Sequence, residues 1–356
     1  MSGKLKAGVI GTGIIGKHHL NNYAGIADAE VVAVCDINKE AAQAAAEQFG
    51  VEQVFSDHTE LLKMAEIDVV DVCLPNVLHC SVTCDALKAG KHVYCEKPFA
   101  NSAAEARKMV KTAQDNDRLL AMQLGTLFSK EARAAKRLID AGRLGRIYYA
   151  KASNYRRRGR PYVDGYATPI FVQKEHAGGG ALPDMGVYHL GLMMYLLDNP
   201  EIETVSASTF QELDMDEGRR KSSGYDVEEL ATALVRFSGD ITLMFEEAWA
   251  AHMDGGTGHR IMGSKGGLKL EPFAFFTNME GIDGDTTFLL DQFETRQNSL
   301  LEDWAGYANS QQHFAWSVLG RVPQIRTDLI GLKVCELTEM MYKSAHQRKE
   351  IRARKR

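Results

Sequence analysis

Apolar residues in the first third of the chain form short continuous runs, and stretches with helical spacing separate these runs. Ser102 stands where a helix N-cap is expected, and Gly50 and Gly90 stand where two helices are expected to end. Continuous apolar strands that alternate with helices predict a parallel sheet covered on both faces. The expected strands are 6–13, 30–36, 51–55, 67–75, 92–98 and 119–124, and the expected helices begin at 17, 39, 78 and 102.

The pattern changes from about residue 126. A helix expected over 131–145 is followed by strands with partial apolar–polar alternation and short turns, and 238–240 has the composition of a hairpin turn. This pattern predicts an α+β domain with a mostly antiparallel, open sheet. The expected strands are 146–156, 203–213, 229–237 and 241–250, and an apolar stripe predicts a helix over 327–347. We therefore expect an α/β domain of residues 1–125 and an α+β domain of residues 126–356.

Composition narrows the classes of function. The chain has 356 residues, more than one core usually holds, and its net charge of −5 argues against a nucleic-acid partner. No apolar run approaches the roughly 18 residues of a membrane span, and the first strand is expected too early for a signal peptide. The six cysteines do not suggest a disulfide framework, and no second Cys/His pair completes a metal site with Cys80 and Cys84. We expect a cytoplasmic protein without a metal or a membrane partner.

The segment 8–16 reads GVIGTGIIG, with Gly11, Gly13 and Gly16 in G-x-G-x-x-G spacing between an expected strand and an expected helix. Asp36 closes the next strand. This is the dinucleotide-binding fingerprint, in which the loop and the helix N-terminus hold a pyrophosphate and the acidic residue accepts from ribose hydroxyls. The alternative is an α/β turn that binds nothing. An Arg after Asp36 would favour a 2′-phosphate, but Ile37 stands there, so we expect NAD rather than NADP. Further expected cofactor contacts are Thr12, Ile14, Ile15 and Ile37.

Other polar residues follow the expected strands of the same sheet. Glu96 and Lys97 come at the end of one strand, and in such sheets ligands bind outside the carboxyl ends of the strands. Lys97 is therefore expected at the cofactor crevice, although a surface lysine in a loop would have the same sequence. Further residues expected to line this crevice are Leu74, Pro75, Asn76, His79 and Gln123.

The third signal is the segment GGGALPDMGVYHLGLMMYLL over 178–197. Its three glycines allow the backbone to pass close to another group, and a helix is expected to begin near Asp184. Tyr188 lies four positions later, on the same face of an ideal helix, whereas His189 is rotated by about 140°. Each residue also has an ordinary structural explanation, because a helix-start Asp is often an N-cap and a Tyr-His pair in an apolar helix is often core.

These motifs together resemble the Gfo/Idh/MocA family, the glucose–fructose oxidoreductase and inositol dehydrogenase type. The resemblance covers nearly the whole chain and rests on GVIGTGIIG, CDIN, LPNVLH, CEKPFA, LIDAGRLGRI, GGGALPDMGVYH and HRIMGSKGGLKL. It implies a Rossmann domain and a second domain whose open sheet serves as an oligomer interface. It also implies NAD(P)-dependent redox chemistry on sugars, cyclitols and related polyols, and a homo-oligomer, a dimer or a tetramer.

The resemblance assigns roles to individual residues. Lys97 matches the lysine that contacts substrate and cofactor, and Asp184 matches the aspartate of the D-x-G motif. The family commonly has a histidine four residues after that aspartate. Tyr188 stands there in this chain, and the histidine, His189, comes one position later. Alignment and helical phase favour Tyr188 as the proton-transfer group, whereas the ordinary pKa values of His and Tyr favour His189 at neutral pH.

Substrate contacts are expected from residues after the first strand of the second domain. Several arginines there suggest contacts to hydroxyls, a carboxylate or a phosphate, but arginines also pair with neighbouring carboxylates. The candidates are Tyr155, Arg156, Arg158, Tyr162 and His176, together with Lys97, Asp184, Tyr188 and His189. We expect hydride transfer between nicotinamide and a secondary alcohol. The alternatives are a glycoside-processing or epimerising enzyme that recycles tightly bound NAD and a non-catalytic NAD- or sugar-sensing regulator.

Overall fold

A computed structural model describes residues 4–300 and 306–354. The chain folds into two compact units. Unit 1 comprises Met1–Gly125 and Asn298–Leu332, and unit 2 comprises Thr126–Gln297 and Lys333–Arg356. The sequence-based division placed a single boundary after residue 125, whereas unit 1 has two segments, the second of which falls within 126–356.

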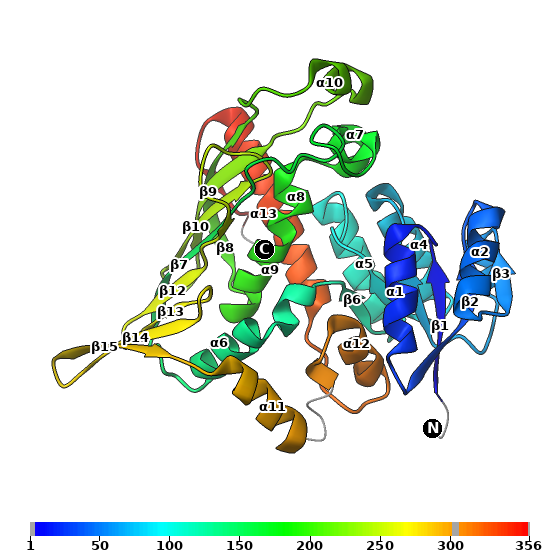
Figure 1. Ribbon diagram of the computed structural model, residues 1–356, viewed down its shortest axis with the longest axis horizontal. Coiled ribbons are helices and arrows are strands. Elements are labelled where there is room, and N and C mark those ends of the chain that lie inside the picture. Colours follow the sequence, from blue (N-terminus) through cyan, green and yellow to red (C-terminus); the bar gives the residue numbers. More distant parts are fainter. Residues whose placement is uncertain (1–3, 301–305, 355–356) are drawn as a thin grey trace. The chain divides into compact units, whose positions relative to one another are not determined.

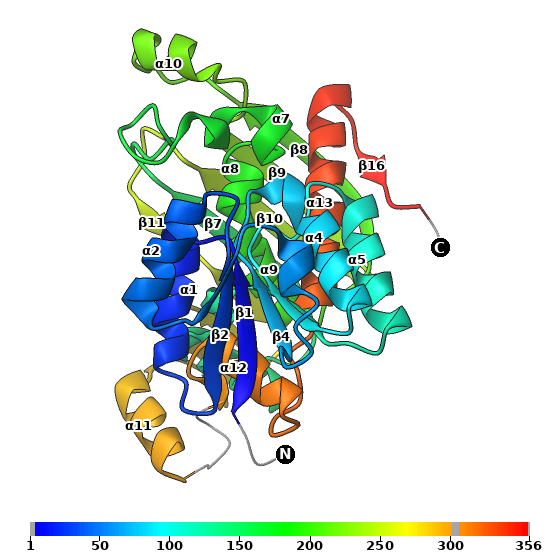
Figure 2. The ribbon, with the colours of Figure 1, turned by 90° about the vertical axis from the view of Figure 1, so that its right-hand side faces the viewer.

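Unit 1 is built on a six-stranded parallel sheet with the order β3-β2-β1-β4-β5-β6. This is the strand order of a dinucleotide-binding Rossmann domain, and it confirms the predicted fold. Figure 2 shows α1 and α2 on one side of the sheet and α4 and α5 on the other. Ser102 caps α5, since its hydroxyl accepts from the N–H of Glu105. The elements are β1 (Leu5–Ile10), α1 (Ile14–Ala24), β2 (Ala29–Cys35), α2 (Lys39–Phe49), β3 (Gln53–Phe55), α3 (His58–Leu61), β4 (Val69–Val72), α4 (Asn76–Lys88), β5 (His92–Cys95), α5 (Ala103–Asp115) and β6 (Leu120–Met122).

The later segment packs against this sheet through helix α12 (Ser310–Val318). Phe314 is buried, and its ring centroid lies 5.6 Å from that of Tyr94 on β5. The hydroxyl of Thr327 accepts a hydrogen bond from the N–H of Met122, and the Gln324 side chain donates one to the carbonyl of Leu120. These contacts join residues about 200 positions apart in the chain, which explains why local pattern did not reveal them.

Unit 2 is built on a ten-stranded sheet with the path β15-β14-β13-β12-β7-β10-β9-β8-β16, and β11 pairs with β7. Among the described strands of this sheet only β7 and β10 pair in parallel, so the sheet is mostly antiparallel, as predicted. The predicted turn at 238–240 joins β9 to β10, and Gly239 and Asp240 have the positive φ angles of a tight hairpin. The strands are β7 (Ile147–Tyr155), β8 (Ile202–Phe210), β9 (Leu230–Phe237), β10 (Ile241–Ala248), β11 (Gly256–Thr257), β12 (Arg260–Gly263), β13 (Gly267–Lys269), β14 (Ala274–Met279), β15 (Ile282–Thr287) and β16 (Ile351–Arg352).

Helices of unit 2 cover one face of this sheet, and Figure 1 shows α6, α8 and α9 on that side. Helix α13 (Thr327–Gln347) begins in unit 1 and continues in unit 2. None of the helices in the described part of the chain is long and apolar enough to cross a membrane. The remaining helices are α6 (Lys130–Asp140), α7 (Lys174–Ala177), α8 (Ala181–Asp184), α9 (Gly186–Leu196), α10 (Glu217–Ser223) and α11 (Leu290–Leu300), with short 3₁₀ turns at Gly125–Phe128 and Pro169–Val172.

Candidate active site

The loop after β1 has the shape that a bound pyrophosphate requires. A Cβ on Gly11 would lie 2.2 Å from the carbonyl oxygen of Cys73, and a Cβ on Gly16 would lie 1.9 Å from that of Gly11, so only glycine fits at these positions. Gly11 also has a φ of 96°. A Cβ on Gly13, in contrast, would meet no atom within 4 Å, and no side chain caps the N-terminus of α1 at this residue. The backbone at Gly13 is thus open to a ligand, and the helix end offers N–H groups to an anion.

Asp36 follows β2 and joins this loop. Its Oδ2 accepts from both the N–H of Thr12, at 2.8 Å, and the Thr12 hydroxyl, at 3.0 Å, while Oδ1 accepts from the N–H of Asn38. The carboxylate is therefore fixed beside the glycine loop. Ile14 is 89% exposed and Ile37 is 92% exposed, so apolar side chains lie uncovered next to it. These residues fit a dinucleotide, with a fixed acidic group where the ribose hydroxyls would lie.

Glu96 and Lys97 follow β5 at the same edge of the sheet. The backbone N–H of Lys97 donates to Oε2 of Glu96 at 2.8 Å, and Lys97 is half-buried. Gln123 follows the neighbouring strand β6. Its Oε1 is buried without a hydrogen-bond partner among the described residues, which leaves an acceptor for a donor group of a ligand.

His79 does not line this edge as the sequence suggested. The side chain is fully buried, and its two ring nitrogens lie 2.8 Å from the carbonyl oxygens of Pro98 and Leu74. His79 therefore joins the loop after β4 to the loop after β5. Burial lowers its pKa, and the two carbonyl contacts partly oppose this effect. In the loop after β4, Pro75 is exposed, and Leu74 and Asn76 are half-buried.

Glu96, the residue before Lys97, belongs to a buried charged cluster. His19 Nδ1 is 3.0 Å from both oxygens of Asp71, and His19 Nε2 is 2.8 Å from Oε1 of Glu96. Burial opposes a charge on His19, but Asp71 and Cys73 outweigh this cost and raise its pKa above the ordinary value. His19, Asp71 and Cys73 are close enough together to hold a metal ion. Because both imidazole nitrogens already face carboxylates, a protonated histidine accounts for the cluster.

The glycines before α8 allow close packing inside unit 2. A Cβ on Gly179 would lie 1.9 Å from the Tyr342 hydroxyl oxygen, and a Cβ on Gly180 would lie 1.9 Å from the carbonyl oxygen of Glu228. The buried Glu228 carboxylate accepts from the N–H groups of Gly180 and Leu182 and from the Tyr342 hydroxyl. Burial raises the pKa of Glu228, while these donors oppose the shift. Close contacts inside unit 2 therefore require the glycines, and the hydrogen bonds to Glu228 fix the start of α8.

The helix predicted to begin near Asp184 is interrupted. Asp184 ends the short α8, Met185 separates the two elements, and α9 begins at Gly186. Asp184 and Tyr188 therefore do not share one ideal helix, and the argument from helical phase no longer separates Tyr188 from His189. Oδ2 of Asp184 accepts from the indole N–H of the buried Trp249 at 3.1 Å, and Tyr188 is half-buried.

His189 is buried and bound to an acidic partner. Its Nδ1 lies 2.5 Å from Oε2 of Glu247, and Oε1 of Glu247 accepts from the Asn154 side chain at 2.6 Å. Burial raises the pKa of Glu247, whereas His189 opposes the shift. The ring of His259 lies 5.0 Å from the His189 ring, centroid to centroid. His189 thus belongs to a polar cluster at the carboxyl ends of β7 and β10.

Of the substrate candidates after β7, the structure brings Arg156 close to α8 and α9. Its Nη2 lies 3.2 Å from the sulfur of Met185. Tyr155 instead hydrogen-bonds Glu246, which also pairs with Lys151, on the sheet face opposite to Asn154 and Glu247. Tyr155 is therefore turned away from His189.

The other candidates lie elsewhere in unit 2. Arg158 is exposed and contacts the His252 ring, and the Tyr162 hydroxyl lies 3.3 Å from that of Ser222 beside α10. His176 is exposed on α7. Arg160 is 1% exposed and pairs with Asp164 and Glu229, so it serves the fold, in line with the tendency of arginines to pair with carboxylates.

Sequence reasoning missed Asp71, Glu247, Asn154 and His259. A signal was present for Asp71, because it is a carboxylate inside an otherwise apolar strand, and a weaker one for Glu247, which follows the apolar residues 243–245 of its strand. Such a residue is rarely buried unless it is paired. His259 and Asn154 carried no comparable signal.

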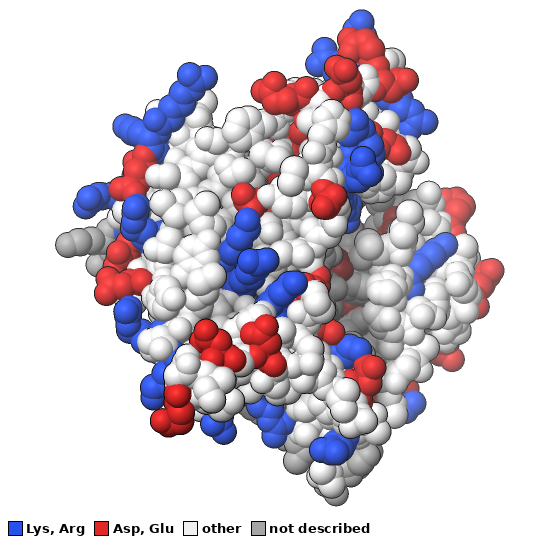
Figure 3. All heavy atoms as spheres, turned by 60° about the vertical axis from the view of Figure 1, so that its left-hand side comes forward, with Lys and Arg blue, Asp and Glu red and all other residues white. Residues whose placement is uncertain are grey.

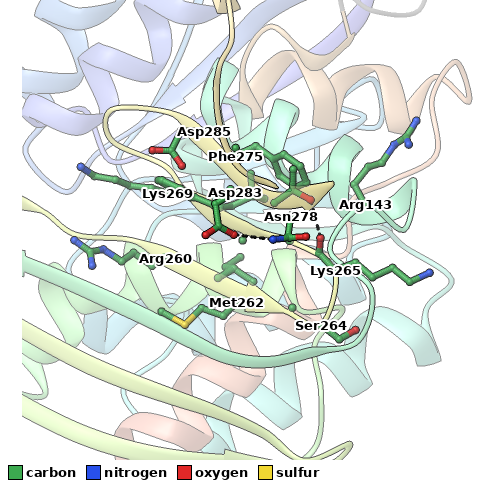
Figure 4. A pocket seen from close by; sticks show the side chains of 18 of the residues that line it. Arg143, Arg260, Met262, Ser264, Lys265, Lys269, Phe275, Asn278, Asp283 and Asp285 are labelled. Atoms are coloured by element: carbon green, nitrogen blue, oxygen red, sulfur yellow. Dashed lines mark hydrogen bonds between the residues drawn. The ribbon is translucent and has the colours of Figure 1, made fainter. Parts of the chain in front are cut away.

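Sequence reasoning also missed an open groove of about 1260 Å³ in the outer part of the second sheet. Figure 4 shows that the hairpins β12–β13 and β14–β15 form it, with side chains of both charges. None of the predicted site residues lines this groove. The labelled charged residues are Arg143, Arg260, Lys265, Lys269, Asp283 and Asp285.

Comparison with known proteins now adds a family to this geometry. A model of the oxidoreductase family with an NAD-binding Rossmann fold matches residues 5–124, and a model of the GFO/IDH/MocA C-terminal domain matches residues 132–269. A D-glucoside 3-dehydrogenase of Escherichia coli K12 is 31% identical over 97% of this chain and 96% of its own length. The chain belongs to the GFO/IDH/MocA oxidoreductase family. The resemblance expected from the motifs is thereby confirmed.

Further family members have related names. A levoglucosan dehydrogenase of Pseudarthrobacter phenanthrenivorans is 28% identical over 70% of this chain and 68% of its own length. A solved levoglucosan dehydrogenase in complex with NADH and L-sorbose shares the fold, with a TM-score of 0.82 and 22% identity over 99% of this chain and 100% of its own. The chain is accordingly an NAD-binding oxidoreductase, and the relatives named above are dehydrogenases.

Proposed function

We propose that the protein oxidises a secondary hydroxyl of a pyranoside, a D-glucoside or a related sugar derivative, with NAD as the hydride acceptor. The observation that carries the proposal is the common sheet edge in unit 1, where the glycine loop, Asp36 and Lys97 follow the parallel strands β1, β2 and β5. The glucoside dehydrogenase that spans nearly the whole chain supports the choice of substrate class. Bound at the glycine loop, NAD supplies the chemistry of hydride transfer.

Lys97 is proposed to hold the reacting hydroxyl and stabilise the negative charge that develops on its oxygen. A lysine ammonium suits this task because it donates hydrogen bonds and carries a positive charge. The hydrogen bond from the backbone N–H of Lys97 to the Glu96 carboxylate supports this role, because it fixes the backbone of Lys97 at the end of β5.

Unit 2 is proposed to supply the groups that orient the sugar and accept the hydroxyl proton. Asp184, held by Trp249, would accept hydrogen bonds from sugar hydroxyls, and Arg156 beside Met185 would donate them. The proton acceptor is proposed to come from Tyr188 or His189 at the start of α9. The contacts of four other candidates do not support a role in substrate binding: Tyr155, Arg158, Tyr162 and His176.

We also propose a homo-oligomer that uses the uncovered face and outer hairpins of the second sheet. Figure 3, in which the left-hand side of Figure 1 comes forward, shows wide areas without charge among scattered charged groups. Large apolar side chains exposed on these strands include Tyr148, Met262, Phe276, Met279 and Ile282. Surfaces of this kind on a soluble domain commonly mark a partner site. Light scattering of the purified protein tests the proposal, and a monomer at micromolar concentration would contradict it.

A cytoplasmic location is proposed as well. All six cysteines are free thiols, and five of them are buried. This usage suits a reducing compartment. Cell fractionation tests the location.

The enzyme activity is tested by NADH formation with a panel of D-glucosides, levoglucosan, inositol, free sugars and sugar acids. We expect NADH with at least one pyranoside, and Lys97→Ala is expected to abolish it. A substrate that is converted without NADH release, by protein that retains NAD through purification, would instead indicate internal recycling of the cofactor. No conversion of any compound by the wild type would contradict the proposal.

A further inference from the structure

Tyr166 of unit 2 has an exposed ring, whereas its hydroxyl is bound within the protein. The residue is 43% exposed. The hydroxyl donates to the carbonyl oxygen of Gly159 at 2.5 Å and accepts from Nη1 of Arg156 at 3.3 Å. Because the hydroxyl already serves these two groups, Tyr166 offers a ligand chiefly the apolar surface of its ring.

The loop that carries Tyr166 is held in a strained conformation. Tyr162 and Ala167 have φ angles of 58° and 60°, which residues with a Cβ rarely adopt, and Gly165 has a φ of 105°. The backbone N–H of Tyr162 donates to the carbonyl of Tyr166 and closes the loop, and the buried ion pairs of Arg160 hold its start. Strained backbone of this kind persists only where the surrounding structure requires it, and it is concentrated at ligand sites.

Tyr166 adjoins the two side chains that are proposed to orient the sugar. Arg156 contacts the Tyr166 hydroxyl through Nη1 and the sulfur of Met185 through Nη2. Burial raises the pKa of Tyr166, Arg156 lowers it and Asp184 raises it, so the phenol lies within electrostatic reach of both charged side chains. A ligand whose hydroxyls bind Arg156 and Asp184 therefore has the Tyr166 ring beside it.

Two more apolar side chains are exposed within five positions of Tyr166. Ile170 is 41% exposed and Phe171 is 42% exposed, both on the 3₁₀ turn Pro169–Val172. Val172 of the same turn is 0% exposed in a core cluster of unit 2, so the turn is anchored to the fold. Exposed apolar side chains that lie together commonly mark a binding site.

We propose that Tyr166, Ile170 and Phe171 form the binding surface for an apolar aglycone, the alkyl or aryl group joined to the sugar through its glycosidic oxygen. The inference rests on the proposed function. The hydroxyls of the sugar require polar partners, which Arg156 and Asp184 supply, whereas the three apolar side chains suit the part of a glycoside that carries no hydroxyls. Tyr166 thus determines specificity for glycosides over free sugars and takes no part in hydride transfer.

Substitutions at Tyr166 separate the ring from the hydroxyl. Tyr166→Ala removes both, whereas Tyr166→Phe keeps the ring and loses the contacts to Gly159 and Arg156. Phe171→Ala tests the surface independently, from the 3₁₀ turn. Phe210→Ala is the matched control, because Phe210 is an aromatic residue of similar exposure, 41%, at the end of β8. Thermal melting establishes that each variant folds.

The readout is the ratio of kcat/KM for phenyl D-glucosides to kcat/KM for methyl D-glucosides, with both anomers assayed. We expect the wild type to prefer the phenyl compound by about tenfold, as burial of one apolar group would provide. Tyr166→Ala should abolish this preference and Phe171→Ala should reduce it. The change should lie in KM, because the aglycone is held equally in the bound substrate and in the transition state. Tyr166→Phe and Phe210→Ala should retain the preference.

Equal kcat/KM for phenyl and methyl glucosides in the wild type would overturn the proposal. Equal losses with both glucosides in Tyr166→Ala would also overturn it, since Tyr166 would then act on the sugar through Arg156. A disaccharide that is preferred over the phenyl glucoside, with this preference lost in Tyr166→Ala, would assign the surface to a second sugar ring instead.

Calorimetric titration of the two glucosides into protein with NAD separates this inference from the proposed function. Failure of every compound to yield NADH would count against the oxidation. Tighter binding of the phenyl glucoside, lost in Tyr166→Ala, would still support the aglycone surface. Equal binding of the two glucosides by the wild type would overturn it.

Discussion

His19 Nε2 lies 2.8 Å from Oε1 of Glu96, and the second oxygen of this carboxylate accepts the backbone N–H of Lys97. The three residues thus connect the first turns of α1 to the end of β5. Asp71 on β4 faces the other nitrogen of His19, and Gln311 of α12 donates to Asp71. The cluster therefore ties four elements of unit 1 to the residue that the proposed function places at the chemical step.

Removal of the His19 charge is expected to destabilise the protein. His19→Gln leaves Asp71 and Glu96 buried without their cation, and breaking a buried ion pair of this kind costs about 3–5 kcal/mol. Denaturant unfolding measures the loss. His18→Gln is the control, because His18 is the exposed neighbour on the same helix. Equal stability of the two variants would show that the cluster contributes little.

Because the pKa of His19 is raised in the folded protein, we expect stability to decline at alkaline pH. The folded pKa of His19 is raised, so above the unfolded value of about 6.5 the folded state binds more protons than the unfolded state. Its contribution is complete below that value and is lost as pH rises toward the folded pKa, by up to about 1.4 kcal/mol per pH unit. Melting curves of the wild type and His19→Gln between neutral pH and pH 9 measure it. We expect a steeper decline in the wild type, and parallel curves would refute this linkage.

At acidic pH, His313 is expected to destabilise the fold. Its Nδ1 donates to the carbonyl of Gly306, and its Nε2 accepts from the N–H of Ile325, an arrangement that requires the neutral ring. Burial lowers its pKa to about 4, so between that value and about 6.5 the unfolded state binds more protons and stability falls as pH falls. His313→Gln should reduce the change of melting temperature with pH over this window, whereas the exposed control His346→Gln should not. A wild type whose melting temperature does not change over this window would contradict the prediction.

Asp36 is expected to make NAD bind more tightly than NADP. The carboxylate is fixed by Thr12 and Asn38, and its charge would repel a 2′-phosphate. Asp36→Ala should narrow the ratio of the two affinities by about tenfold, equivalent to about 1.4 kcal/mol. Calorimetric titration with both cofactors measures the ratio, with Glu40→Ala on the exposed start of α2 as control. Tighter binding of NADP by the wild type would remove Asp36 from this role.

Much of unit 1 could be predicted from the sequence because its determinants are local. Continuous apolar strands, the glycine spacing and Asp36 specify the parallel sheet and its ligand edge within short segments. The membership of Asn298–Leu332 in unit 1 could not be predicted, since it depends on contacts such as Phe314 against Tyr94. In unit 2, β11 to β15 were missed because these strands are short and several contain glycine, which weakens the alternation.

The candidate site divides in the same way. Lys97, Asp184 and Tyr188 stand in recognisable motifs, but the break at Met185 depends on how α8 is held by Glu228 and cannot be read from helical spacing. Glu247, the partner of His189, comes from β10, 58 positions away (247 − 189), and Asn154, which donates to Glu247, comes from β7, 35 positions away (189 − 154). Only the three-dimensional pairing of those strands brings Asn154 and Glu247 together.

We propose that the protein passes a hydride from a sugar carbon to NAD, that the hydroxyl on this carbon loses its proton, and that Lys97 assists this step. The most direct test incubates purified protein with NAD and a D-glucoside and follows NADH by absorbance and the sugar by mass spectrometry. For the wild type we predict equal amounts of NADH and of a sugar product lighter by two hydrogens. We predict that Lys97→Ala still binds NAD but forms neither product. The exposed-site control Lys88→Ala should behave as the wild type. A Lys97→Ala protein with wild-type turnover, or a wild type that forms no oxidised sugar from any pyranoside or cyclitol, would contradict the account.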